Sequence, residues 1–314
     1  MSTKLKGTIY GVIAAVSYGT NPLGALFLYK EGLNVNSVLF YRFSLAAIIL
    51  AGIMLVQKKS FSVTRKELGL LGILGILFAT SALSLFTSFH YMDAGVASTI
   101  LFVYPVMVAV IMALFFKEKL SLVTMLSISL ALGGIALLYK GEGGSTLSSI
   151  GVLLVMLSSL TYAVYIIVVN KSTLMMSAVK LTFYVLVFCM LVIVVHSFSE
   201  TNNHLQLLTT PTMWMWAAIL ALVPTVISLI TMVKAVHAIG STPTAIMGAL
   251  EPLTAVVIGI AIFGEVLTVR LATGIVLILS AVIIIIAGKS ITPLKLHTAV
   301  NNVGRVLKKY FRWK

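Results

Sequence analysis

Residues 89–121 read FHYMDAGVASTILFVYPVMVAVIMALFFKEKLS, and residues 236–268 read VHAIGSTPTAIMGALEPLTAVVIGIAIFGEVLT. The two stretches align without a gap, so that Pro105 falls on Pro252, and a histidine and a glutamate coincide as well. Shared Leu and Ile would be weak evidence, but proline, histidine and glutamate at one fixed offset are specific. We therefore predict that the chain consists of two related halves.

The halves are expected to lie in a membrane. Of the 314 residues, 60% are hydrophobic and only 10% are charged, and the mean hydropathy is +1.12. A soluble domain has about 25% charged residues. Apolar runs of about 20 residues fit the hydrocarbon core of a bilayer as helices, and they lack the alternation of barrel strands. Ten such segments are predicted, near residues 7–29, 36–56, 67–91, 95–116, 121–139, 149–170, 178–196, 213–236, 242–263 and 268–288.

The fold class is therefore predicted to be all-α: a polytopic membrane protein with ten transmembrane helices as two inverted five-helix repeats. An odd number of helices per half makes the second half enter the membrane from the opposite side, as in many secondary transporters. The domains are predicted as 1–143 for the first repeat, 144–289 for the second, and 290–314 for a basic tail. The first segment is expected to be a retained helix rather than a cleaved signal peptide.

Basic residues predict the orientation of the chain. With the N-terminus inside, only Lys30, Lys140 and Arg270 fall outside, and all other lysines and arginines that flank the segments fall inside. Both termini are therefore expected in the cytoplasm of a multi-pass inner (plasma) membrane protein. Residues 294–314 fit an amphipathic helix on an anionic leaflet, with a disordered basic tail as the alternative.

The segments YRFSLA (41–46), YPVMVAVIMALFFKEKLS (104–121) and LEPLTAVVIGIAIFGEVLT (250–268) resemble the drug/metabolite transporter superfamily, specifically its ten-helix EamA-type members. The resemblance covers nearly the whole chain, and the proline-to-glutamate spacing in both halves is its most specific part. It implies a bacterial-type inner-membrane exporter or importer of a small metabolite, such as an amino acid, a related compound or a drug-like molecule. It specifies no substrate.

Glu251 is the first candidate functional residue, because its segment places it near the centre of the bilayer. A charged acid at that depth costs about 2.5–3.5 kcal/mol on insertion scales, and burial favours the protonated form. Two interpretations stay open: a carboxyl that carries a proton or binds a substrate amine, and an acid that only ties helices together. Its repeat partner is Tyr104, so the central region is expected to be electrically asymmetric.

Pro105 and Pro252 directly follow these two residues, and each is predicted to be either a hinge or a static kink. Arg42 lies a little inside the second segment. It either extends to the outer interface or binds a substrate carboxylate or an intramembrane acid.

Polar side chains at helical spacing mark two further helices as candidates for lining a pathway. The alternative is close packing between helices. The members of these stripes are Ser81, Ser84, Ser88 and Tyr91 in the first half and Thr225, Ser228 and Thr231 in the second. Similar positions in the first helix of each half carry Tyr18, Asn21, Tyr162 and Tyr165. The aromatic faces of the three tyrosines are expected either to stack on a substrate or to shield it from water.

The preferred function is a secondary transporter that works by alternating access, with export coupled to protons as one possibility and an uncoupled uniporter or exchanger as the other. A membrane-embedded enzyme or a scaffold is disfavoured, because the sequence has no HExxH, GxSxG or GxxxxGK[ST] motif and only one aspartate. No catalytic residue, metal or cofactor is expected. The predicted partners are a small-molecule substrate, membrane lipids and protons, but no nucleic acid. The small-residue stretches GGIA (133–136) and SAVI (280–283) indicate close helix packing or a homodimer face.

Overall fold

The computed structural model describes residues 3–117, 121–139, 147–172, 174, 176–199 and 204–290. Helices contain most of these residues, and no described residue lies in a β-strand. The predicted boundary between the halves, at residues 143 and 144, and the predicted tail helix within 294–314 lie outside the described residues.

The first half forms five spans. In chain order, the helices described in it are α1 (Thr3–Gly19), α2 (Asn21–Lys30), α3 (Val35–Val56), α4 (Arg65–Ser88), α5 (Ala94–Leu101), α6 (Tyr104–Phe116) and α7 (Leu122–Tyr139). Two of the spans are made of two helices each, because α1 continues into α2 and α5 continues into α6.

The second half also forms five spans. Its described helices are α8 (Ser149–Lys171), α9 (Ala178–Ser197), α10 (Pro211–Ala221), the π-helix η2 (Leu222–Ile227), α11 (Ser228–Ile239), α12 (Ser241–Met247), α13 (Leu250–Phe263) and α14 (Val269–Ser290). Within the described residues, 9 spans are long and apolar enough to cross a bilayer, and the shorter apolar helix Leu122–Leu138 is the tenth. The prediction of an all-α protein with ten membrane-spanning helices is confirmed.

Polar caps define where helices begin at the membrane surface. Asn34 precedes α3, and its side chain accepts a hydrogen bond from the backbone N–H of Ser37 over 2.8 Å. Thr64 and Glu67 form a reciprocal capping box at the start of α4. These side chains satisfy backbone donors that the first helical turn leaves without partners.

Prolines explain why four spans are interrupted. A proline has no N–H, so the carbonyl four residues earlier loses its helical donor and the helix bends or breaks there. Pro22 lies just after the break between α1 and α2, Pro105 and Pro252 lie at the starts of α6 and α13, and Pro224 lies inside η2. The prolines that the sequence marked as hinges or kinks are thus the first-turn residues of half-length helices.

Neighbouring hydroxyl groups occupy two of the carbonyls that these prolines release. Ser159 of α8 donates to the carbonyl of Leu101 over 2.9 Å, four residues before Pro105. Thr225 donates to the carbonyl of Leu220 over 3.2 Å, four residues before Pro224. In a membrane a freed backbone group must find such a partner or face a wet cavity.

Contacts between the halves occur in matched pairs, as a repeat requires. Ser81 of α4 donates to the carbonyl of Ser158 in α8 over 3.0 Å. At the repeat-related place, Ser228 of α11 donates to the carbonyl of Ala14 in α1 over 2.9 Å. Each half therefore packs its third span against the first span of the other half.

Two lysine–aromatic contacts also join the halves as a matched pair. The Lys30 ammonium lies 5.0 Å from the centre of the Phe263 ring, and the Lys171 ammonium lies 5.0 Å from the centre of the Phe116 ring. Phe116 and Phe263 are partners in the sequence alignment. A lysine above an aromatic ring is stabilised by the negative face of the ring.

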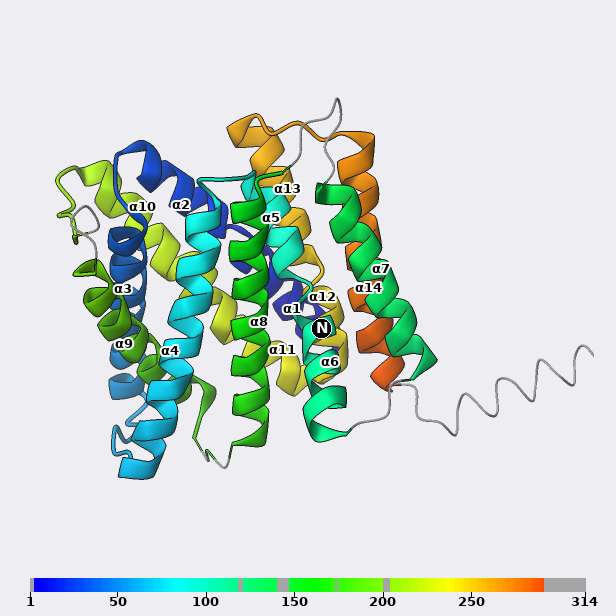
Figure 1. Cartoon of the computed structure of the whole chain (residues 1–314). Coiled ribbons are helices and arrows are strands. Elements are labelled where there is room, and N and C mark those ends of the chain that lie inside the picture. The colour runs from blue at the N-terminus through cyan, green and yellow to red at the C-terminus, as the bar shows by residue number, and fades with distance from the viewer. Residues whose placement is uncertain are drawn as a thin grey trace, which may run out of the picture.

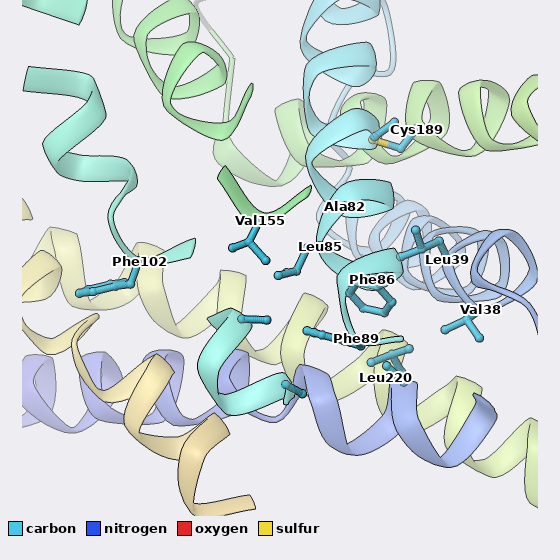
Figure 2. Packing of buried hydrophobic residues seen from close by; sticks show 14 of the residues in the cluster. Val38, Leu39, Ala82, Leu85, Phe86, Phe89, Phe102, Val155, Cys189 and Leu220 are labelled. Atoms are coloured by element: carbon cyan, nitrogen blue, oxygen red, sulfur yellow. The ribbon is translucent and has the colours of Figure 1, made fainter. Parts of the chain in front are cut away.

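Large side chains of α3, α4 and α10 fill the core on one side of the bundle. In Figure 2, Phe86 of α4 and Phe89, the residue that follows α4, project towards Leu39 of α3 and Leu220 of α10, and all four belong to one buried cluster. The free thiol of Cys189 is buried and donates to the carbonyl of Gly75 over 3.3 Å. Its role is one of packing between α9 and α4.

The helices α7 and α14 form a separate pair at the right-hand edge of the bundle in Figure 1. Gly134 of α7 faces Gly274 of α14, and a Cβ at Gly134 would lie 2.9 Å from the Gly274 carbonyl oxygen. This small-residue contact lets the backbones approach closely, in agreement with the packing predicted for the GGIA stretch.

Gly134→Ala should therefore lower the unfolding free energy by about 1–3 kcal/mol, the usual penalty for overpacking. Gly133→Ala is the matched control, because a Cβ at Gly133 would meet nothing within 4 Å. The measurement is the melting temperature of each purified variant in detergent. Equal melting temperatures for the two variants would contradict the proposed contact.

Candidate functional site

A small cavity lies where the interrupted helices of the two halves meet. Its volume is about 30 Å³, which is room for one or a few water molecules. The residues that line it are Tyr18, Gly19, Asn21, Pro22, Leu85, Ser98, Leu101, Phe102, Tyr104, Tyr162, Glu251 and Pro252. They belong to α1, α2, α4, α5, α6, α8 and α13 and to the junction between α5 and α6, so both halves build the cavity.

Three helix breaks bring the backbone to this cavity. The junction of α1 and α2 contributes Gly19 and Asn21, the junction of α5 and α6 contributes Phe102, and α13 begins just before Glu251. Gly19 is required at the first junction, because a Cβ there would lie 2.5 Å from the carbonyl oxygen of Glu251. The span formed by α1 and α2 thus contacts α13 directly beside the acid.

Glu251 is the only acidic residue of the cavity lining, and it lies in the first turn of α13. The positive end of a helix dipole favours a carboxylate at such a position. Its side chain is partly exposed, and that exposed surface faces the cavity. Within the described residues, its carboxyl group has no ion pair and no side-chain hydrogen bond.

Tyrosines surround the acid. The rings of Tyr104 and Tyr162 meet edge to face, with centres 4.7 Å apart. Tyr18, Tyr104 and Tyr162 all lie within electrostatic reach of Glu251. Tyr165 stacks on Tyr162 with ring centres 5.8 Å apart but does not line the cavity.

Asn21 is the first residue of α2, and its side chain is 5% exposed. Its oxygen Oδ1 is buried and has no hydrogen-bond partner among the described residues. Among the described residues, every other fully buried side-chain oxygen or nitrogen has a hydrogen-bond partner. A buried acceptor without a donor costs about 1–3 kcal/mol.

Arg42 lies beside the cavity rather than in its lining. It is 3% exposed, its Nε donates to Oγ1 of Thr225 over 3.0 Å, and its guanidinium carbon lies 5.3 Å from the rings of Phe43 and Phe86. It does not form an ion pair with Glu251 within the described part of the chain. Tyr18 lies within electrostatic reach of both Arg42 and Glu251.

The local backbone explains the position of Thr225. A π-helix is rare and occurs frequently at functional sites, and here it surrounds Pro224. The wider turn lets the Thr225 hydroxyl donate to its own helix and accept from Arg42. The described residues place no carboxylate against this arginine.

The serine and threonine stripes lie away from the cavity. Ser81 and Ser228 form the hydrogen bonds between helices described above, and Ser88 and Thr231 donate to carbonyls of their own helices. Ser84 is buried and is not part of the lining. The structure therefore uses most of these hydroxyl groups for packing.

Sequence reasoning missed Ser98, Leu101 and Phe102, which supply much of the cavity wall. A signal for them was present: a proline at 105 predicts a helix break within the preceding turn. Residues at a break are the ones whose backbone and side chains can face a cavity.

Glu265 has a structural role outside the cavity lining. Its carboxylate accepts hydrogen bonds from the backbone N–H groups of Ala94 over 2.9 Å and Gly95 over 3.4 Å. Glu265 lies between α13 and α14 and therefore caps the start of α5 from the other half of the chain. Partial burial and the nearby Asp93 carboxylate raise the pKa of Glu265, while the two N–H groups that it accepts from act in the opposite direction.

Among the described residues, no cluster of His, Cys, Asp or Glu could hold a metal ion.

Comparisons with known proteins agree with this architecture. The sequence matches the EamA-like transporter family twice, over residues 5–140 and 149–287. An "Uncharacterized transporter" of Clostridium kluyveri is 24% identical over 298 residues, which cover 89% of this chain and 92% of the relative. An "Uncharacterized transporter" of Haemophilus influenzae is 26% identical over 167 residues, which cover 51% of this chain and 54% of the relative. One solved crystal structure shares the fold at 15% identity, with a TM-score of 0.64 over 90% of this chain and 96% of the other.

The cap at Glu265 predicts a pH dependence of stability. A carboxyl whose pKa is higher in the folded protein binds more protons when folded, so the unfolding free energy rises as pH falls through the raised pKa towards the ordinary value of 4.5. Glu265→Gln should show a smaller rise in melting temperature on acidification from neutral pH. Glu265→Ala should lose the cap, and about 1 kcal/mol of stability, at every pH.

The exposed Glu31 at the end of α2 provides the control variant Glu31→Gln. Its acidification profile should match that of the unmodified protein. A Glu265→Gln profile that also matches would show that this carboxyl does not titrate in the expected way.

Proposed function

The chain belongs to the EamA-like transporter family, and we propose from this premise that it moves a small metabolite across the membrane by alternating access, with Glu251 carrying a coupled proton. Membrane transport is the activity common to the family and to the names of both relatives. The substrate and the coupling are the parts that we propose.

The position of Glu251 carries the proposal. It is the one acid in a cavity that both halves build, and no cation within the described residues neutralises it. A buried carboxyl without a partner is more stable as the neutral acid. Opening the cavity to water on either side would favour release of the proton, and closing it would favour retention. An acid in this setting can therefore exchange a proton with each side in turn.

The helix breaks support the movement that alternating access needs. In this conformation the cavity of about 30 Å³ is too small for a metabolite, since ligand pockets have volumes of about 300–1,000 Å³. The half-helices α6 and α13 begin at Pro105 and Pro252. Rotation at these two junctions would enlarge the cavity towards one face while the other face stays closed.

The orientation is part of the proposal. Lysines and arginines gather on the side that we assign to the cytoplasm, which the positive-inside rule favours. Under this assignment both termini are cytoplasmic, the halves are inverted in an inner (plasma) membrane, and Glu265 caps α5 at the outer face.

The proposal is tested by flux measurements in proteoliposomes. Amino acids, sugars, nucleosides and cationic drugs are first screened for thermal stabilisation of the purified protein, and the best stabiliser is used as a labelled substrate. The unmodified protein should accumulate this compound when a pH gradient is imposed across the proteoliposome membrane in one of the two directions. Glu251→Gln should reduce this accumulation by about 10-fold, within the usual range of coupling between two ligands, while counterflow continues at a saturating concentration of the compound.

Glu265→Gln is the matched control, because it removes a carboxyl that lies outside the cavity lining. It should leave the gradient-driven accumulation unchanged. Full accumulation by Glu251→Gln would remove the coupling role and favour a uniporter or an uncoupled exchanger. If the folded, unmodified protein moves none of the compounds, the proposed transport function is refuted.

A further inference from the structure

We propose that the substrate is an amine, and that its ammonium group binds between Asn21 and Glu251 by donating N–H bonds to both. This inference rests on the proposed transport function and extends it to a chemical class of substrate. It starts from a different observation, namely the unpartnered oxygen of Asn21.

Asn21 has a buried acceptor that lacks a hydrogen-bond donor among the described residues. Its Oδ1 is buried without a partner among the described residues, and the side chain lines the cavity. Buried polar groups nearly always have partners, so an exception needs an explanation. One water molecule could donate to Oδ1, but water would leave the charge of an ionised Glu251 uncompensated. A single ammonium group satisfies both residues, because it provides several N–H donors and a positive charge.

The charge of the lining selects a cation over an anion. The polar residues of the lining are Tyr18, Asn21, Ser98, Tyr104, Tyr162 and Glu251, and no lysine, arginine or histidine is among them. Arg42, the nearest buried cation, is bonded to Thr225 outside the lining. A ligand carboxylate would therefore meet no positive side chain on the cavity wall and would be repelled by ionised Glu251.

Aromatic and apolar side chains complete the site. The rings of Tyr104 and Tyr162 form one side of it, and ring faces attract an ammonium group. Leu85, Leu101 and Phe102 form the apolar part of the wall. The site thus fits an amine with an apolar body, once the cavity opens to admit it.

Binding of the amine would replace a proton on Glu251. The titratable groups that face this acid are the hydroxyls of Tyr18 on α1, Tyr104 on α6 and Tyr162 on α8. The parts of α2, α4 and α5 that line the cavity contribute no titratable group. Loss of one proton from Glu251 on binding would make substrate and proton compete for the same carboxyl, which is the basis of exchange.

The test compares three probes that share a benzyl group: benzylamine, benzyltrimethylammonium and benzyl alcohol. Calorimetric titration of the purified protein measures the affinity for each probe. Repeating the titration in buffers of different ionisation enthalpy measures the protons released. The unmodified protein should bind benzylamine best, with about one proton released at mildly acidic pH. Glu251→Gln should lose both the preference for benzylamine and the release.

Asn21→Leu separates ligand binding from a structural role. It should weaken benzylamine binding by about 10-fold or more, since a hydrogen bond to a charged group is lost. Binding of benzyltrimethylammonium, which has no N–H, should not change. Without ligand, Asn21→Leu should melt about 2 °C or more above the unmodified protein, because the unpartnered oxygen is removed. Asn21→Asp keeps an acceptor and should retain benzylamine binding.

Several outcomes would overturn the inference. They are unchanged benzylamine binding in Asn21→Leu, a lower melting temperature of that variant without ligand, and equal binding of benzyl alcohol and benzylamine by the unmodified protein. Failure to bind benzylamine together with counterflow of another compound would reject the amine and leave the transport function intact. Absence of counterflow for every compound would reject the transport function itself.

Discussion

Every backbone polar group in the hydrocarbon core needs a partner, and this constraint governs how the interrupted helices are arranged. Pro105 and Pro224 each remove a donor, and hydroxyl groups of Ser159 and Thr225 occupy the released carbonyls. Such breaks are tolerated only inside protein or beside a wet cavity. The junctions of three interrupted spans therefore gather at the centre of the bundle, and the same constraint that restricts them creates the candidate site.

The two halves share a framework but differ at the centre. Matched hydrogen bonds of Ser81 and Ser228 join the third span of each half to the first span of the other. Glu251, in contrast, occupies the position that Tyr104 has in the first half. Repetition therefore accounts for the packing, while the departure from repetition provides the single acid on which the proposed chemistry depends.

The cavity holds polar groups in an arrangement that does not favour stability. Asn21 has an acceptor without a donor within the described residues, and Glu251 has no cation there. Arg42 has partners, but they are a hydroxyl and aromatic rings rather than a carboxylate. Stability alone would replace these groups with apolar ones. Binding sites often keep such groups because a ligand completes them.

The sequence alone determined the ten spans and the kinship of the halves, because apolar length and a proline at a fixed offset are local or repeated properties. It also identified Glu251, Tyr18, Asn21, Tyr104 and Tyr162, all of which line the cavity. Only the tertiary structure decided that the hydroxyls of Ser81 and Ser228 join helices, that Arg42 bonds to Thr225, and that Ser98 and Phe102 line the cavity. The reason is geometric: helical periodicity shows which residues share a face, but the neighbour of that face depends on how distant helices pack.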